Sequence, residues 1–153
     1  MKSLPGSWAY EVRERVRALR VYTSTSAVAA AGEAGKTTLL RVEGHTSTNV
    51  YLDSIASYCT AMGRPLEAVL LPWTAGAPPD GDTHADPSEA VRRRLRALVE
   101  THGLRPLATK AKLHHSTLAR LSSGEYRRID LIRLERIARA TNTTPAQLVL
   151  GTD

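Results

Sequence analysis

The sequence predicts an all-α protein made of two similar helical domains joined by a linker rich in proline and glycine. Three features predict this class: the composition, a repeat at a fixed offset, and the clustering of Pro and Gly between the two copies. The chain has 153 residues, no Phe and only 5% aromatic residues, whereas Leu, Ala and Arg, which favour helices, are frequent. That length is sufficient for two helical domains of roughly 60 residues each.

The repeat appears when the chain is shifted by 79 positions. Residues 12–19 then fall on 91–98, and residues 37–42 fall on 116–121, with no gap between the two matches. The matched positions are mainly apolar residues at helical spacing, in the same order. This pattern indicates that one domain has been duplicated.

Residues 72–87 are rich in Pro and Gly and locally acidic, a composition typical of a linker. We therefore place the first domain at residues 8–71 and the second at residues 88–151. Each domain is expected to contain about five short helices, because the apolar pattern breaks that often.

The first helix of each domain is predicted by an apolar stripe at i, i+4 and i+7. The stripe consists of Val12, Val16 and Leu19 in one copy and Val91, Leu95 and Leu98 in the other. Pro106 and Pro145 mark the starts of later helices, because proline needs no N–H partner at the first helical position. Thr144 is placed to cap the helix that begins at Pro145.

The centre of each copy contains a short helix with an apolar-Ala pair, a brief turn and a second helix. The segments are Val28-Ala29 followed by Thr37-Thr38-Leu39-Leu40-Arg41-Val42-Glu43, and Leu107-Ala108 followed by Ser116-Thr117-Leu118-Ala119-Arg120-Leu121-Ser122. Closing segments around Tyr58-Cys59 and Ile137-Ala138 follow. This order resembles the Cro/lambda-repressor-like (XRE) family of helix-turn-helix proteins, and the resemblance covers both copies. It implies two lambda-repressor-like domains in tandem.

Two departures from the family concern the turn between its second and third helices. The family usually has Gly there, where a positive φ is required, but this sequence has Glu33 and Lys112. We expect both turns to differ slightly from the family.

The resemblance also implies which residues contact DNA, because the second helix of the motif lies in the major groove. Arg120 can donate two hydrogen bonds to guanine O6 and N7. The residues expected at base edges are His115, Ser116, Thr117 and Arg120 in the second copy, and Lys36, Thr37, Thr38 and Arg41 in the first.

Phosphate contacts are expected mainly from the second copy. The residues are Arg105, Lys110, Lys112, Arg127 and Arg128, whereas the first copy has Ser26, Ala31, Glu33, Thr48 and Asn49 at the matching positions. The net charge of the chain is +6. Residues 7–72 carry seven Lys or Arg against six Asp or Glu, but residues 87–153 carry thirteen against six. The second copy is therefore predicted to be the principal DNA-binding domain.

These observations favour a sequence-specific transcriptional regulator of double-stranded DNA, a repressor that occupies an operator. Two alternatives stay open: a protein-interaction module of antiactivator or antitoxin type acting through the first domain, and a non-specific nucleoid binder. The linker could also let one chain span two half-sites about 34 Å apart. A homodimer with four reading helices is the other arrangement, and the sequence does not decide between them.

Several other functions are not indicated. The segment Gly32–Thr38 is similar to a phosphate-binding loop, but that motif would need Gly at position 30, where this sequence has Ala. His114 and His115 have no further ligands at metal-binding spacing, and no catalytic constellation is present. We therefore expect no enzyme activity, cofactor or metal. The single Cys59 is expected to be a small buried residue, and the protein to act in the cytoplasm, at the nucleoid, without a membrane span.

Overall fold

The computed structural model describes residues 7–22, 50–73, 76–79, 81 and 86–151. Over these residues the chain is helical and forms no β-strand, which confirms the predicted all-α class for this part of the sequence. The helices are α1 (Trp8–Tyr22), α4 (Leu52–Met62), α5 (Glu67–Leu70), α6 (Ser88–His102), α7 (Leu104–Ala111), α8 (His115–Ser123), α9 (Leu131–Ala140) and α10 (Pro145–Leu150).

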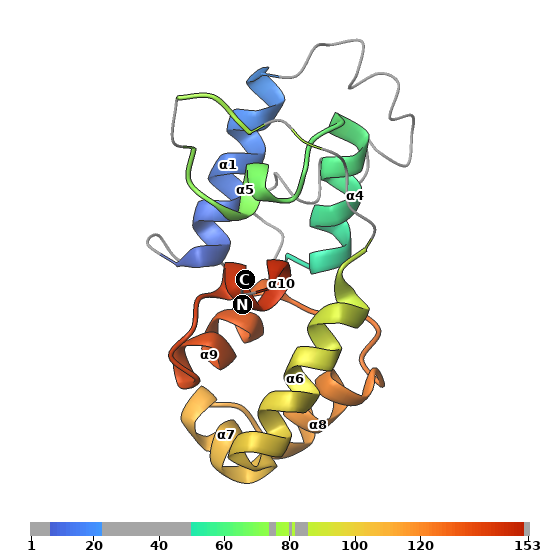
Figure 1. Cartoon of the computed structure of the whole chain (residues 1–153), viewed down its shortest axis with the longest axis vertical. Helices are drawn as coiled ribbons and strands as arrows, with labels where there is room; N and C mark the ends of the chain where they lie inside the picture. The colour runs from blue at the N-terminus through green and yellow to red at the C-terminus, as the bar shows by residue number, and fades with distance from the viewer. Residues whose placement is uncertain (1–6, 23–49, 74–75, 80, 82–85, 152–153) are drawn as a thin grey trace.

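The helices lie in two groups along the long axis of the molecule (Figure 1). We call α1, α4 and α5 the N-terminal half and α6 to α10 the C-terminal half. The C-terminal half has five helices, the number expected for residues 88–151. No helix in the described ranges is long and apolar enough to cross a membrane.

The opening helices bury the apolar stripes that predicted them. Val12, Val16 and Leu19 of α1 are fully buried, as are Val91 and Leu95 of α6. The last residue of the second stripe, Leu98, is only half-buried and packs at the edge of the core.

Two proline-marked helix starts were predicted, and one begins where expected. α10 starts at Pro145, with Thr144 as its N-cap: the Thr144 hydroxyl accepts from the Gln147 N–H at 3.2 Å, and the Gln147 side chain accepts from the Thr144 N–H at 3.0 Å. α7 instead starts at Leu104, two residues before Pro106. Pro106 still lies in the first turn, where a missing N–H breaks no helical hydrogen bond.

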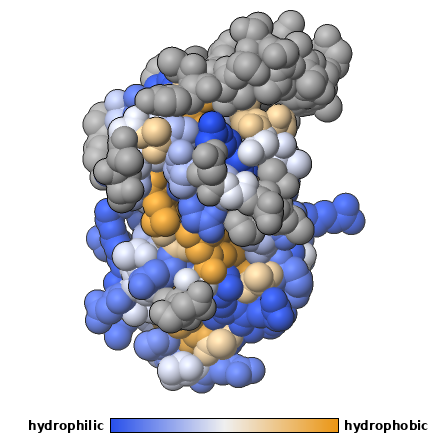
Figure 2. Space-filling model, turned by 45° about the horizontal axis from the view of Figure 1, so that its top comes forward, coloured by the Kyte–Doolittle hydropathy of each residue, from blue (hydrophilic) through white to orange (hydrophobic). Residues whose placement is uncertain are grey.

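A single core continues through both halves. Buried side chains of α1 and α4 join those of α7, α8 and α9 in one cluster. Figure 2 shows hydrophobic residues in a narrow band at the middle of the visible face, bordered by hydrophilic ones. Cys59 belongs to this core as expected, and burial raises the pKa of its thiol to about 12, with a smaller contribution from Glu67.

The two halves also share a backbone contact. Tyr51 and Asp130 form an isolated antiparallel bridge. The flanking hydrogen bonds run from the Leu52 N–H to the Ile129 carbonyl (2.8 Å) and from the Leu131 N–H to the Val50 carbonyl (2.9 Å). Each of these residues lies 79 positions from its counterpart in the other half, so the two bonds are reciprocal.

Other features recur at the same offset of 79. The Arg15 guanidinium donates to the carbonyl of Val69 at 3.2 Å, and that of Arg94 donates to the carbonyl of Leu148 at 2.9 Å. After α4 the chain turns through Gly63 at φ 66°, and after α9 it turns through Asn142 at φ 54°. The arginine contact and the left-handed turn thus recur at an offset of 79 among the described residues.

Candidate DNA-binding surface

The candidate surface is built on α7 and α8, which are joined by the short turn that contains Lys112. Lys112 adopts the left-handed conformation (φ 57°, ψ 42°) that the family normally assigns to Gly. Its N–H donates to the Thr109 carbonyl at 3.2 Å, and the Leu113 N–H donates to the Ala108 carbonyl at 2.9 Å. The left-handed residue of the motif is therefore retained despite the missing Gly.

α8 begins with an unusual cap. The Nδ1 atom of His114 accepts a hydrogen bond from the Ser116 N–H at 3.2 Å and lies 2.6 Å from the Ser116 hydroxyl oxygen. Such a cap satisfies one of the unpaired N–H groups at the helix start.

α8 separates buried from accessible residues as the motif requires. Leu118 and Leu121 are fully buried and hold the helix against the core. The four residues predicted at base edges remain accessible on the other side: His115, Ser116 and Thr117 are half-exposed, and Arg120 is exposed.

Arg120 is held by two residues of the loop that follows α8. Its Nη1 lies 3.4 Å from the Tyr126 hydroxyl, its Nε lies 3.7 Å from a Glu125 carboxylate oxygen, and its guanidinium lies 5.8 Å from the centre of the Tyr126 ring. Hydrogen bonding to Tyr126, supported by Glu125, raises the pKa of Arg120. Sequence reasoning missed both residues, and their position just after α8 is the only signal that could have indicated them.

A recess of about 390 Å³ lies between α7 and the start of α8. It is lined by Arg105, Ala108, Thr109, Leu113, His114 and His115. The two imidazole rings stack with centres 4.4 Å apart. Partial loss of hydration lowers the pKa of His115, and the charges of Arg105 and His114 lower it further. The positive charge of Arg105 suits this recess, which lies beside the reading helix, to an anionic group such as phosphate.

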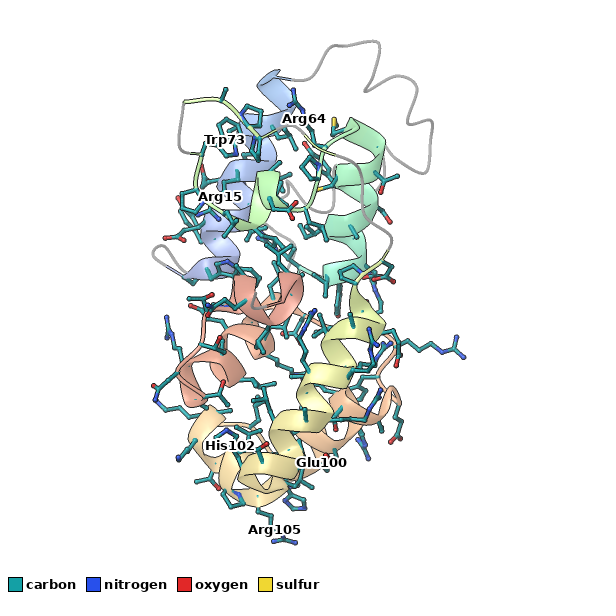
Figure 3. The ribbon with its side chains drawn as sticks, in the orientation of Figure 1. Arg15, Arg64, Trp73, Glu100, His102 and Arg105 are labelled. Atoms are coloured by element: carbon teal, nitrogen blue, oxygen red, sulfur yellow. The ribbon has the colours of Figure 1, made fainter. Side chains whose placement is uncertain are left out.

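The predicted phosphate-binding residues fall into two groups. Arg105, Lys110, Lys112 and Arg127 are exposed, and Figure 3 shows Arg105 pointing away from the body of the molecule. Arg128 instead faces the N-terminal half: its Nε lies 3.2 Å from the Asp53 carboxylate, its Nη2 donates to the Ser54 hydroxyl at 2.7 Å, and its guanidinium lies 4.0 Å from the centre of the Tyr51 ring.

The run of arginines on α6 serves mainly to bind backbone carbonyls. Arg92 donates to the carbonyls of Tyr126 and Arg127 in the loop after α8, and Arg96 donates to the carbonyl of Ser122 at 3.0 Å. These contacts hold the loop that positions Arg120 against the body of the domain.

The base-contacting residues predicted in the first copy are Lys36, Thr37, Thr38 and Arg41, and they lie outside the described residues. Across the ranges that are described, no group of three or more His, Cys, Asp or Glu side chains could hold a metal ion.

Comparison with known families matches residues 94–149, from the middle of α6 to the last turn of α10, to one family of helix-turn-helix domains. These residues form a Cro/C1-type HTH DNA-binding domain. The match includes α7, the Lys112 turn, α8 and α9, which are the elements that build the surface described above. No curated protein and no solved structure matches the chain. The Cro/C1-type domain supports the assignment of this chain as a DNA-binding regulator.

Proposed function

We propose that the chain is a sequence-specific transcriptional regulator that represses a promoter by occupying an operator in double-stranded DNA. The observation that carries this proposal is the accessible edge of α8, where His115, Ser116 and Arg120 stand on a Cro/C1-type domain. Arg120 is suited to guanine because a guanidinium presents two parallel donors to O6 and N7. The protein would act by binding alone, without a cofactor or a catalytic step, and we place it at the nucleoid.

The surface around α8 fits a duplex electrostatically. Four exposed basic residues, Arg105, Lys110, Lys112 and Arg127, flank the reading edge, and the recess beside His115 adds a site for a phosphate oxygen. Each phosphate contact displaces condensed counterions, so binding is expected to weaken steeply with salt.

The test is selection of binding sequences from a random duplex library with three proteins: the wild type, Arg120→Ala and Arg120→Lys. Both variants should lose preference for guanine at one position, because lysine keeps the charge but not the two-donor fork. The discrimination lost should be about 1–3 kcal/mol. Arg93→Ala is the matched control, since Arg93 is an exposed arginine on α6 away from the core stripe. An unenriched library with the wild type would overturn the regulator proposal.

We propose further that the N-terminal half is a second copy of the domain, so that residues 8–71 and 88–151 form a tandem pair joined by residues 72–87. The reciprocal bridge and the recurring arginine contacts at an offset of 79 support this proposal. The first copy would read a different half-site through Lys36, Thr37, Thr38 and Arg41. One chain would then occupy a bipartite, asymmetric operator.

Two measurements test the tandem arrangement. Arg41→Ala should erase one half of the selected motif and Arg120→Ala the other. Native mass spectrometry of the complex should give one chain for each bipartite site. Two chains on a palindrome would instead support a homodimer, and a motif insensitive to Arg41→Ala would turn attention to a protein partner for the first half.

A further inference from the structure

A groove of about 290 Å³ lies between α6 and α10, away from α8. Its floor is apolar, with Ala97 and Leu98 from α6 and Leu148 from α10. Its rim is formed by Arg94, Thr101, Thr141, Thr143 and Gln147. This volume is close to the lower limit for small-molecule sites, which is about 300 Å³.

The hydrogen-bond chemistry of the rim restricts what can bind. The Thr101 hydroxyl donates to the Ala97 carbonyl at 2.9 Å, that of Thr141 to the Ile137 carbonyl at 3.0 Å, and that of Thr143 to the Gln147 side-chain oxygen at 2.7 Å. A hydroxyl has one proton to donate and two lone pairs to accept with. Each of the three hydroxyls has therefore used its proton and keeps lone pairs that can accept a hydrogen bond, so a ligand with a donor group complements them.

The comparison with the rest of the chain rests on the proposed tandem arrangement, in which residues 79 positions apart correspond. The residues 79 positions before Arg94, Thr143 and Gln147 are Arg15, Arg64 and Ala68. Trp73 packs against the core, and its indole N–H donates to the Ala68 carbonyl at 2.7 Å. Figure 3 shows Trp73 in the same part of the molecule as Arg15 and Arg64.

The leucine at the floor of the groove is less buried than its counterpart in α1. Leu19 of α1 is fully buried, whereas Leu98 of α6, 79 positions later, is half-buried. None of the described residues that line the C-terminal groove is a tryptophan, and the half-buried Leu98 leaves apolar surface on its floor.

We propose that the groove between α6 and α10 binds a free planar aromatic molecule of indole size that carries an N–H donor. The ring lies on Ala97, Leu98 and Leu148, and its N–H donates to the threonine oxygens of the rim. The Arg94 guanidinium lies at the rim of the groove, where its bonds to the carbonyls of Leu148 and Val149 (2.9 Å) fix it. From there it stacks on the face of the bound ring.

The experiment is a fluorine NMR titration of 5-fluoroindole with the purified full chain. We expect one saturable site in the wild type and at least tenfold weaker binding by Ala97→Trp, in which the new ring fills the groove. Arg93→Trp, which adds an indole elsewhere on α6, should bind as the wild type does. Binding that is not saturable, or that Ala97→Trp leaves unchanged, would overturn the proposal.

Three further binding measurements test the identity of the ligand. 1-Methylindole, which lacks the N–H, should bind several-fold more weakly than indole, and equal binding would contradict the role of the threonine oxygens. Trp73→Ala should show two sites in place of one, because it opens the corresponding place in the N-terminal half. Tenfold tighter binding of a short tryptophan-containing peptide would assign the groove to a partner's side chain and overturn the small-molecule assignment. None of these readouts depends on DNA, so their failure is distinct from failure of the proposed regulator function.

Discussion

At the scale of single residues, Lys112 combines a backbone cost with a predicted role in DNA binding. A non-glycine residue in the left-handed region costs roughly 1–2 kcal/mol, and glycine avoids this cost. Glycine also loses more conformational freedom on folding, which cancels part of the gain. Lys112→Gly should therefore raise the free energy of unfolding by about 0.5–1 kcal/mol while reducing the salt dependence of DNA binding by about one counterion. Urea unfolding and binding at two salt concentrations would measure the two effects. Lys110→Ala, as control, should change only the second, and a loss of stability in Lys112→Gly would contradict the strain argument.

His115 should give the folded protein a measurable dependence on pH. Its pKa is lowered by partial loss of hydration and by the charges of Arg105 and His114, so the fold favours the neutral ring. In the unfolded chain the pKa is about 6.5. The contribution of His115 to stability is thus present above pH about 6.5 and is lost as the pH falls toward its lowered folded value. Urea unfolding at pH 7.5 and 5.5 should show a smaller pH dependence for His115→Gln than for the wild type. Equal pH dependence of the two proteins would remove His115 as the cause.

At the scale of elements, the short helix α10 depends on its capping box. It has six residues, too few for stability by propensity alone, and it carries the buried Leu148 and Val149. Thr144→Ala removes the hydroxyl that accepts from Gln147 and should lower the free energy of unfolding by about 1 kcal/mol. Ser57→Ala is the control, because Ser57 is exposed on α4. A loss no larger than that of the control would show that packing alone holds α10.

The elements that sequence could predict are those with a local signal. The stripes of α1 and α6 repeat at helical spacing, and Thr144-Pro145 marks a helix start through the chemistry of two adjacent residues. The contacts that sequence could not predict join distant residues. Arg128 was expected at a phosphate because basic residues follow the reading helix, but its nearest acceptors, Asp53 and Ser54, lie some 75 positions away. Such pairing depends on how the two halves pack, and the spacing of residues along the sequence carries no information about that packing.

The same limit applies to the whole molecule. The offset of 79 predicts that Tyr51 and Asp130 are equivalent residues, but it gives no reason for them to lie side by side. The halves are joined into one body by this bridge and by the shared core. In addition, the backbone N–H of Trp8 donates to the Glu135 carboxylate at 3.3 Å. The predicted linker also packs against this body, because Pro78 is buried and Trp73 packs on the core.

This packing predicts that the two halves unfold together. Both tryptophans, Trp8 and Trp73, lie before α6, so indole fluorescence follows α1, its contact with Glu135 and the segment after α5, while far-UV circular dichroism follows every helix. The two urea transitions should coincide. Leu134→Ala, a cavity in the C-terminal core, should shift both midpoints equally and cost about 2–5 kcal/mol. If the fluorescence transition of Leu134→Ala stayed at its wild-type midpoint, the halves would be independent domains, because a cavity in one would then leave the other unaffected. Coincident shifts would instead mean that a cavity in α9 of the C-terminal half destabilises the half that the tandem proposal assigns to the second half-site.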